Sequence, residues 1–320
     1  MNDSQRKRGK TIHRETGKTF YYATRLLPER IREQTYVLYG FFRIADEVVD
    51  DGFDREPSAQ RAELESIRGA ALGEEATEEP VIAAFAEIRA QAGIPDEEVD
   101  AFIDAMIADI DTDRYETDDD LESYMRGSAA AVGNMMTAIM EPDQPETARP
   151  HAMALGEAFQ LTNFIRDVRE DIEELGRVYL PLTTLRRNDV TVEQLQHGEV
   201  TPGLRRAIQS ELARAETRYR HGVQGIEYLP SDCQFAVLLS AVLYAEHHRL
   251  IRAQEFDVLS TRPSLSRPRK LWLIARTWWN WRRYRDPVTV FRRVSAIPSE
   301  EAPPDETATG GPDHGVPSPD

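Results

Sequence analysis

Apolar residues recur along most of the chain at the three- and four-residue spacing of an α-helix. One such run holds Phe102, Ile103, Met106, Ile107 and Ile110, and another holds Phe235, Leu238, Leu239, Val242 and Leu243. This spacing puts the apolar side chains on one helix face. No comparable stretch alternates with the two-residue period of a strand, and Gly and Pro separate the runs near positions 52–57, 93–95, 142–150, 176–181 and 202–203. The pattern predicts an all-α, single-domain bundle of about eight or more helices, since a helix averages about 11 to 12 residues.

Composition changes after residue 262. Residues 263–295 contain nine basic side chains, one acidic side chain (Asp286) and all four tryptophans of the protein. We expect a basic, Trp-rich helical arm here, which either contacts a membrane peripherally or packs back on the acidic core or on another subunit. Residues 296–320 hold six acids and no base among Pro, Gly, Ser and Thr, which predicts a disordered acidic tail. Residues 1–17 are expected to form a flexible basic N-terminus.

The chain is strongly acidic, with 56 acidic and 39 basic residues and a formal net charge of −17. No nucleic-acid partner is expected for such a chain. Only four of the basic residues are lysines. That bias fits a halophilic protein, because in molar salt the Debye length falls to about 3 Å and self-repulsion costs little; a GC-rich genome would also favour arginine. The single cysteine, Cys233, excludes an internal disulfide framework, and no apolar run of transmembrane length occurs. We expect a cytoplasmic location, with the inner face of the membrane as the site of any peripheral contact.

Two segments combine carboxylates at four-residue spacing with apolar neighbours. The first, residues 39–51, holds Asp46 and Asp50, which project from one helix face because positions four apart differ by about 40° in azimuth. The second, residues 160–171, holds Asn163, Asp167 and Asp171 at the same spacing. Aligned oxygen ligands favour Mg²⁺ or Mn²⁺ held jointly with substrate phosphates. We call the two sets the first and second acidic rows and predict that they face each other.

Paired acids at this spacing also occur on solvated helix faces, where they pair with arginine. We interpret the run 118–120 and the acids between Asp96 and Asp104 in that way. The first row differs because Tyr39, Phe41, Phe42, Ile44, Val48 and Val49 make its helix apolar around most of its circumference. Such a helix is expected to be buried, and buried charges need partners.

Residues 18–262 resemble the squalene and phytoene synthases, which have the isoprenoid synthase fold with a central active-site cavity. The resemblance rests on the segments Phe20-Tyr21-Tyr22-Ala23, Tyr39 to Asp51, Tyr124 to Gly133, Gly156 to Asp171 and Gly176-Arg177-Val178-Tyr179-Leu180-Pro181, and on Met106, Asp109, Arg114 and Tyr115. It implies head-to-head condensation of two allylic prenyl diphosphates through a cyclopropylcarbinyl diphosphate.

The resemblance also implies roles for single residues. Those expected to hold Mg²⁺ are Asp46, Asp50, Asn163, Asp167 and Asp171, and the acids among them are also expected to be catalytic. Residues expected to bind phosphate oxygens are Arg43, Arg166 and Arg177, with internal pairing to the same acids as the alternative. Tyrosines expected near the cationic intermediates are Tyr39, Tyr179 and Tyr244, the last with a core aromatic as the alternative. Further residues expected to contact substrate are Phe20, Tyr21, Gln160 and Gly133, the last together with the small residues 128–131, which could also serve only close helix packing.

The sequence departs from the family pattern at several positions. Phe42 stands where Cys is usual, Glu47 follows Asp46 where Asp is usual, and Thr183-Thr184 follows where acids are common. The pair His247-His248 and Phe256 replace the family's acidic helix and closing tyrosine. Neighbouring helical positions point about 100° apart, so the two histidines cannot share one metal, and we expect surface or supporting roles for them.

Three functions are consistent with these observations. The favoured one joins two C20 units, geranylgeranyl diphosphate, to phytoene in carotenoid biosynthesis. The alternatives are a squalene or dehydrosqualene synthase, which joins two C15 units, and a non-catalytic assembly factor on the same fold. Complete acidic rows argue against the assembly factor, because a scaffold has no need for buried aligned carboxylates.

Overall fold

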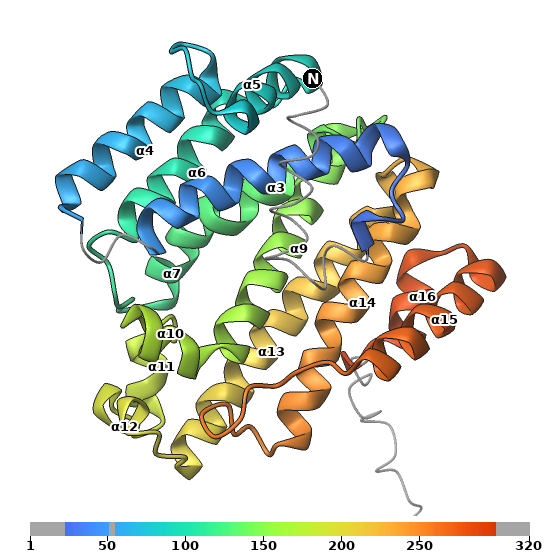
Figure 1. The fold of residues 1–320 in the computed structure, drawn as a ribbon. Coiled ribbons are helices and arrows are strands. Elements are labelled where there is room, and N and C mark those ends of the chain that lie inside the picture. The colour runs from blue at the N-terminus through green and yellow to red at the C-terminus, as the bar shows by residue number, and fades with distance from the viewer. Residues whose placement is uncertain (1–22, 51–54, 299–320) are drawn as a thin grey trace, which may run out of the picture.

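The computed structural model describes residues 23–50 and 55–298, and their regular structure is helical (Figure 1). The all-α prediction is therefore confirmed. The first helices along the chain are α3 (Glu29–Asp50), α4 (Pro57–Leu72), α5 (Pro80–Ala92), α6 (Asp96–Ala108) and α7 (Asp118–Met125). A π-helical turn η1 (Arg126–Ala131) leads into α8 (Val132–Ala138), α9 (Pro145–Arg166) and α10 (Val168–Leu175). The remaining elements are α11 (Leu182–Arg187), α12 (Val192–Gln196), α13 (Pro202–Gln224), the 3₁₀ turn η2 (Gly225–Tyr228), α14 (Ser231–Ala253), α15 (Arg267–Tyr284) and α16 (Pro287–Val294).

Helix α9 is the centre of the arrangement. It packs against α13, α14, α8 and η1, while α3 packs against α4, α5 and α6 on the other side of the molecule. In Figure 1 the short helices α10 to α12 close one end of the bundle, and α15 and α16 lie beyond α14. This arrangement places the first acidic row, at the C-terminal end of α3, near the second, which runs from the end of α9 into α10.

The helix boundaries follow the turn chemistry of the sequence. Pro57, Pro80 and Pro202 stand in the first turns of α4, α5 and α13, where the missing N–H costs nothing. Gly73 and Gly93 end α4 and α5 in the left-handed region, with φ of 80° and 64°.

The core around α3 confirms that this helix is largely buried. Phe41 is fully buried and stacks on Phe85 with ring centroids 3.9 Å apart, and Phe102 lies 5.3 Å from it. Phe42, at the position where the family has Cys, packs on Phe102 at 5.0 Å. Aromatic packing of this kind fixes α3 between α5 and α6 and so fixes the direction of its carboxylates.

Small residues allow α6, η1, α8 and α9 to approach closely. A Cβ on Gly133 would lie 2.4 Å from the Ala152 carbonyl oxygen, and a Cβ on Gly156 would lie 2.4 Å from the Ala129 carbonyl oxygen. The two glycines therefore interlock α9 with η1 and α8 from both sides. The packing alternative for these small residues is supported, and both glycines also line an apolar pocket described below.

One sequence-based expectation was wrong. Glu98, taken as part of a solvated acidic face, is 1% exposed and pairs with Arg126, Arg149 and the amide of Asn134, all from distant parts of the chain. Of the two alternatives for His247 and His248, the surface one is excluded, because these residues are only 4% and 0% exposed.

The arm 263–295 packs on the body through one face of α15. Leu273, Thr277 and Trp281 are buried there, and the packed segment extends past residue 295, since Ile297 is buried as well. Among the residues described, no helix has the length and apolar character needed to span a bilayer. Residues 1–22 lie outside the described part, and with them the proposed flexible N-terminus and the first family motif apart from Ala23, as does the tail from 299 onward.

Candidate active site

The first acidic row lies on the last two turns of α3 and borders a pocket with about 450 Å³ of empty space including its mouth. Arg43, one turn earlier, reaches both acids: its Nη1 is 2.5 Å from Asp46 Oδ2 and 3.7 Å from Asp50 Oδ2. The Arg43 Nε also donates to Glu47 at 3.1 Å. The row predicted from four-residue spacing is therefore formed, with an arginine among its carboxylates.

The second row differs from the predicted single helix, because α9 ends at Arg166 and α10 begins at Val168. Asp167 stands at the break with φ −105° and ψ 12°. The helical register nevertheless continues, since the Asp167 N–H donates to the Asn163 carbonyl at 2.8 Å and the Asp171 N–H donates to the Asp167 carbonyl at 2.9 Å. Asn163, Asp167 and Asp171 consequently border the same pocket as Asp46 and Asp50, so the two rows face each other as predicted.

Arginines neutralise the second row in part. Arg166 binds Asp167 in a bidentate manner, with its Nε 2.7 Å from Oδ1. Arg262, from the segment after α14, lies 2.8 Å from the same oxygen and 2.5 Å from Glu170. A fork of this shape also matches phosphate oxygens. The internal-pairing alternative is thus present for Arg166 and Arg43, and binding of phosphate by these groups stays a prediction.

Arg177 connects the segment after α10 to the first row. The chain turns at Gly176, whose φ of 68° requires the left-handed region, and the Arg177 N–H closes the turn on the Asp171 carbonyl at 2.9 Å. The Arg177 Nη1 lies 3.5 Å from Asp50 Oδ1 and donates to the Tyr179 hydroxyl at 3.3 Å. One buried guanidinium therefore lies between the two rows.

Sequence reasoning did not single out Asp109 and Tyr124, which also border this pocket. The Tyr124 hydroxyl donates to Asp109 Oδ2 at 2.8 Å, and the Arg177 Nη2 donates to the Asp109 carbonyl at 2.8 Å. Burial raises the pKa of Asp109 to about 7, opposed by Arg177. Both residues occur in segments that resemble the family, which was the signal that could have identified them.

Aromatic rings cover one side of the pocket. Tyr179 stacks on Phe164 at 4.1 Å and lies 5.9 Å from both Tyr124 and Tyr115, measured between ring centroids. Their π faces offer a surface that attracts positive charge. Tyr244 is not stacked in this group. It packs on Phe159 at 4.7 Å and lies against an apolar cluster that includes Leu155, Tyr219 and Leu239.

Gln160 borders the pocket between the two acidic rows, which we call the polar pocket. One turn earlier on α9, Gly156 lines an apolar pocket instead. This second pocket, with about 770 Å³ of empty space including its mouth, is lined by residues such as Gly133, Met136, Gly156 and Phe159. Helix α9 therefore runs past both pockets, polar at its C-terminal end and apolar before it. Of the remaining predicted site residues, Tyr39 is half-buried on α3, and Phe20 and Tyr21 lie outside the described residues.

Two carboxyl groups of the polar pocket are difficult to ionise, because they are buried and lie near other carboxylates. Burial and the neighbouring Asp50 raise the pKa of Asp46 to about 6, and burial with Asp167 and Glu170 raises the pKa of Asp171 to about 8. The buried Asn163 Oδ1 accepts no hydrogen bond from any residue described. Each of these features fits a bound divalent cation, which favours ionised carboxylates and takes hard oxygen ligands.

Protein ligands alone do not complete such a site. In residues 23–50 and 55–298 no group of three or more His, Cys, Asp or Glu side chains converges closely enough to hold a metal ion. The acids are instead spread over two opposed rows. That spacing fits Mg²⁺ ions which take one or two carboxylates each and complete their coordination with substrate phosphates and water.

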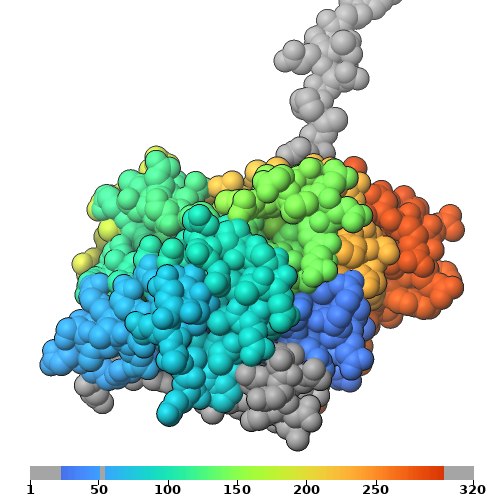
Figure 2. Space-filling model, turned by 90° about the horizontal axis from the view of Figure 1, so that it is seen from above, coloured from blue at the N-terminus to red at the C-terminus, as the bar shows by residue number. Residues whose placement is uncertain are grey.

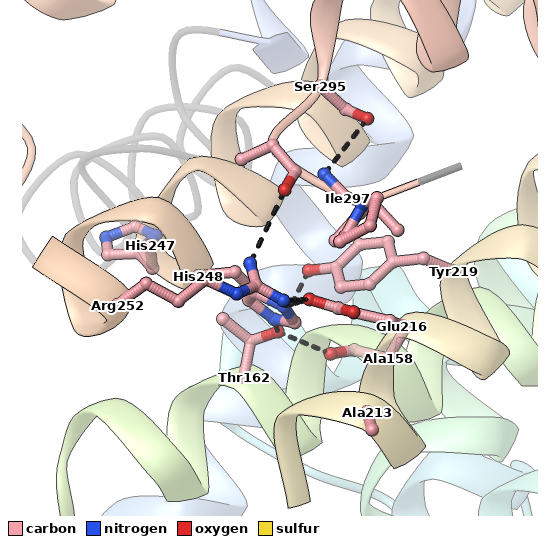
Figure 3. A network of polar contacts seen from close by, with 12 residues as sticks. Ala158, Thr162, Ala213, Glu216, Tyr219, His247, His248, Arg252, Ser295 and Ile297 are labelled. Carbon is pink, nitrogen blue, oxygen red and sulfur yellow. Dashed lines mark hydrogen bonds and ion pairs between the residues drawn. The ribbon is translucent and has the colours of Figure 1, made fainter. Parts of the chain in front are cut away.

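A buried polar network supports α9 from behind the second row (Figure 3). His248 on α14 lies 3.0 Å from Thr162 Oγ1 through Nε2 and 3.1 Å from Glu216 on α13 through Nδ1. Thr162 also contacts the Tyr219 hydroxyl at 3.0 Å, and Arg252 pairs with Glu216. Because Thr162 immediately precedes Asn163, this network fixes the rotation of α9 where the second row begins.

Comparisons with known proteins agree with the site. The family model described as squalene/phytoene synthase matches residues 13–269. The phytoene synthase of Rhodobacter capsulatus is 31% identical over 259 residues, covering 80% of this chain and 76% of the relative, and that of Thermus thermophilus is 34% identical over 247 residues, covering 77% and 83%.

Solved structures show the same fold. A dehydrosqualene synthase in complex with a ligand superposes with a TM-score of 0.79 at 26% identity, covering 88% of this chain and 98% of that one. A squalene synthase from Alicyclobacillus acidocaldarius gives a TM-score of 0.68 at 26% identity, covering 79% and 95%. The sequence motifs, the opposed acidic rows and these matches establish that the chain belongs to the squalene/phytoene synthase family.

Proposed function

We propose that this protein is a 15-cis-phytoene synthase, a prenyltransferase that condenses two molecules of geranylgeranyl diphosphate head to head in carotenoid biosynthesis. The observation that carries the proposal is that two pockets follow each other along α9: one has two opposed acidic rows, and the other is apolar. A prenyl diphosphate has the same two parts, an anionic head and a long apolar tail. The relatives named phytoene synthase, at 31% and 34% identity, support the C20 substrate.

The residues of the polar pocket would bind and orient the diphosphates. Mg²⁺ held by Asp46, Asp50, Asn163, Asp167 and Asp171 would neutralise the diphosphate leaving group. Arg43, Arg166 and Arg177 would exchange part of their pairing with carboxylates for phosphate oxygens, where a planar guanidinium binds well. Mn²⁺ has the same preference for oxygen ligands and could replace Mg²⁺.

The apolar lining would hold the prenyl chains and exclude water. In the first step one substrate would lose its diphosphate, the resulting allylic cation would join the 2,3 double bond of the other substrate, and loss of a proton would close the ring of a cyclopropylcarbinyl diphosphate. In the second step this intermediate would lose the remaining diphosphate, and the cation would rearrange and lose a proton to give phytoene. Tyr179 and its stacked neighbours lie where positive charge would develop near the acidic rows, and the ring faces would stabilise it.

The experiment supplies Mg²⁺ with either C20 diphosphate or C15 diphosphate, the latter with and without NADPH, and identifies the hydrocarbons extracted. We expect phytoene from C20 diphosphate alone. A C30 product formed in preference would place the chain in the squalene or dehydrosqualene branch. That branch is the second candidate, because the two similar solved structures are a dehydrosqualene synthase and a squalene synthase.

Asp167→Asn tests whether the rows act in this reaction, because it keeps the shape of the side chain and removes its charge. Product formation should fall by at least about 100-fold, the loss expected when a charge that stabilises the transition state is removed. The control is Glu174→Gln, which also removes one negative charge but at an exposed position of α10, and it should leave the rate unchanged. Absence of any hydrocarbon from folded protein supplied with Mg²⁺ would favour the assembly factor.

A further inference from the structure

The C-terminal arm is almost entirely outside the part of the chain that defines the family. The family match ends at residue 269, whereas α15 continues to Tyr284 and α16 to Val294. The arm is nevertheless folded onto the body: α16 packs on α13 and α14, and α15 packs on α14 and α16. In Figure 2 it forms one edge of the molecule. The arm is therefore an ordered part of the molecule, most of which lies beyond the residues of the family match.

The outer face of α15 is aromatic. Leu271, Trp272, Trp278 and Trp279 are 67%, 45%, 46% and 69% exposed, and the small exposed residue Ala275 lies among them on the helix surface. At 100° per residue these five positions span roughly one third of the helix circumference. The buried residues Leu273, Thr277 and Trp281 occupy the opposite side. Large side chains exposed together in this way mark an interaction surface.

Arginines surround these rings. The guanidinium carbon of Arg276 lies 4.9 Å from the centre of the Trp272 ring, and that of Arg282 lies 5.0 Å from Trp278. Arg283 and Arg285 are exposed near the end of the helix. Asp286, the single acid of the arm, is used to cap α16 through the Thr289 N–H. The outer face is therefore both aromatic and cationic on a chain whose net charge is −17.

We propose that this outer face of α15 docks on the surface of an anionic lipid bilayer. Tryptophan rings are favourable at the level of the lipid head groups, and each arginine near an anionic bilayer contributes about 1 kcal/mol. Helix α15 lies along the surface in this arrangement and does not cross it. The proposal concerns attachment and does not depend on which prenyl diphosphate the site accepts.

A second copy of the chain fits this face less well. Of the large apolar side chains that the structure describes as exposed, only Leu26 lies outside α15, so a second copy offers no matching apolar surface elsewhere. Contact between two α15 helices would bury arginine against arginine, which like-charge repulsion opposes. A lipid surface supplies both an apolar phase for the rings and phosphate groups for the guanidinium groups.

Docking at α15 would place the substrate pocket one helix away from the bilayer. Ala236, Val237 and Ser240 of α14 line the apolar pocket. Leu238, Leu239 and Val242 of the same helix belong to the hydrophobic cluster that contains Leu273 and Trp281 of α15. Helix α14 therefore lies between the two, so a bilayer at α15 would be separated from the apolar pocket by one helix.

The test measures co-sedimentation of the full chain with vesicles of phosphatidylglycerol and phosphatidylcholine, and with vesicles of phosphatidylcholine alone. We expect at least about tenfold tighter binding to the anionic vesicles, with a blue shift of tryptophan fluorescence. Measurements start at the lowest KCl concentration at which circular dichroism shows the chain folded. The anionic preference should shrink at about 1 M KCl, because the Debye length there is about 3 Å.

Two variants locate the surface. Ala275→Glu places a negative charge in the centre of the outer face and keeps a good helix former, and it should weaken binding to anionic vesicles at least about tenfold. Arg282→Gln combined with Arg283→Gln should weaken it similarly. The control, Arg187→Gln combined with Arg206→Gln, changes the net charge equally at exposed positions of α11 and α13 and should bind as the parent does.

Four outcomes would overturn the proposal. The first is equal binding to neutral and anionic vesicles, and the second is a loss of vesicle binding in the control pair as large as in the arm variants. The third is that the chain does not bind vesicles but self-associates, and that Ala275→Glu abolishes the self-association. The fourth is displacement from vesicles by a single-stranded oligonucleotide, which would identify α15 as a site for nucleic acid. Circular dichroism of each variant separates loss of binding from loss of folding.

Discussion

Arg177 Nη1 lies 3.5 Å from Asp50 Oδ1, so a guanidinium from the segment after the second acidic row reaches the first row. The same side chain donates to the Asp109 carbonyl and to the Tyr179 hydroxyl. It therefore holds together four parts of the pocket: α3, the end of α6, the turn after α10 and the aromatic stack. Because it lies between the rows, its guanidinium both connects these parts and offsets the negative charge of the carboxylates.

Arg177→Lys tests this relationship. An ammonium is a point charge and cannot reach both Asp50 and the Asp109 carbonyl. We expect the free energy of unfolding to fall by about 1.5–3 kcal/mol, the range for buried hydrogen bonds to charged groups. Product formation should fall at least about tenfold because the rows lose their common partner. Denaturant unfolding and initial rates measure the two effects, with Arg206→Lys, an exposed position, as the control.

His248→Leu tests the network behind α9. It keeps an apolar body of similar size but leaves Thr162 and Glu216 without the imidazole, which should cost about 1–3 kcal/mol of unfolding free energy. If the network also fixes the rotation of α9, kcat should fall more than KM rises, since Asn163 would be misplaced for the reaction rather than for binding alone. A variant with lower stability and unchanged kcat would limit the network to a stabilising role.

The buried His247 should make the stability of the protein depend on pH, with lower stability at lower pH. Burial and Arg166 lower the pKa of His247 from 6.5 to about 4, so the unfolded chain binds a proton that the folded chain excludes. Its contribution to stability is complete above about pH 6.5 and is lost as the pH falls towards 4, by up to about 3 kcal/mol. The difference in unfolding free energy between the parent and His247→Phe should therefore change over this window. An identical pH dependence in both proteins would contradict the assignment.

Binding of Mg²⁺ should release protons. The pKa values of about 8 for Asp171 and about 6 for Asp46 mean that part of this carboxylate set is protonated near neutral pH in the absence of a cation. A cation binds the ionised forms, so its apparent affinity should increase from pH 6 to pH 8. Calorimetry in two buffers of different ionisation enthalpy counts the protons. Asp171→Asn should lower that count, and a count of zero in the parent would contradict the prediction.

Alanine at Gly133 or Gly156 should destabilise the protein by about 1–3 kcal/mol, the usual cost of overpacking. The new Cβ would approach a backbone carbonyl oxygen to 2.4 Å in each case, and backbone cannot rotate away as a side chain can. Gly198→Ala is the control, because that position is open and carries only the strain of its φ of 70°. Thermal unfolding ranks the three variants, and a control as damaging as the other two would contradict the steric explanation.

The helical fold and both acidic rows could be predicted because their signals are local. Four-residue spacing identified Asp46 with Asp50, and the apolar circumference of α3 correctly predicted its burial. The break at Asp167 could not be predicted this way, since the residues on either side keep the helical spacing.

The features that could not be predicted from the sequence depend on partners from distant parts of the chain. Arg177 and Asp109 are 68 positions apart, and His248 and Glu216 are 32 apart on different helices. Glu98 resembles its exposed acidic neighbours until Arg126 and Arg149 are brought to it by folding. In each case a buried polar or charged side chain finds its partner in a distant part of the chain.

The interlock of Gly133 and Gly156 limits how the product spectrum of this protein could be altered by engineering. Both glycines line the apolar pocket, yet neither can be enlarged without pushing η1 and α8 away from α9. Adjusting the pocket to a shorter or longer prenyl chain is therefore left to wall residues with flexible side chains, such as Met136 and Met140. A library directed at those methionines should retain folded enzymes far more often than one directed at the glycines.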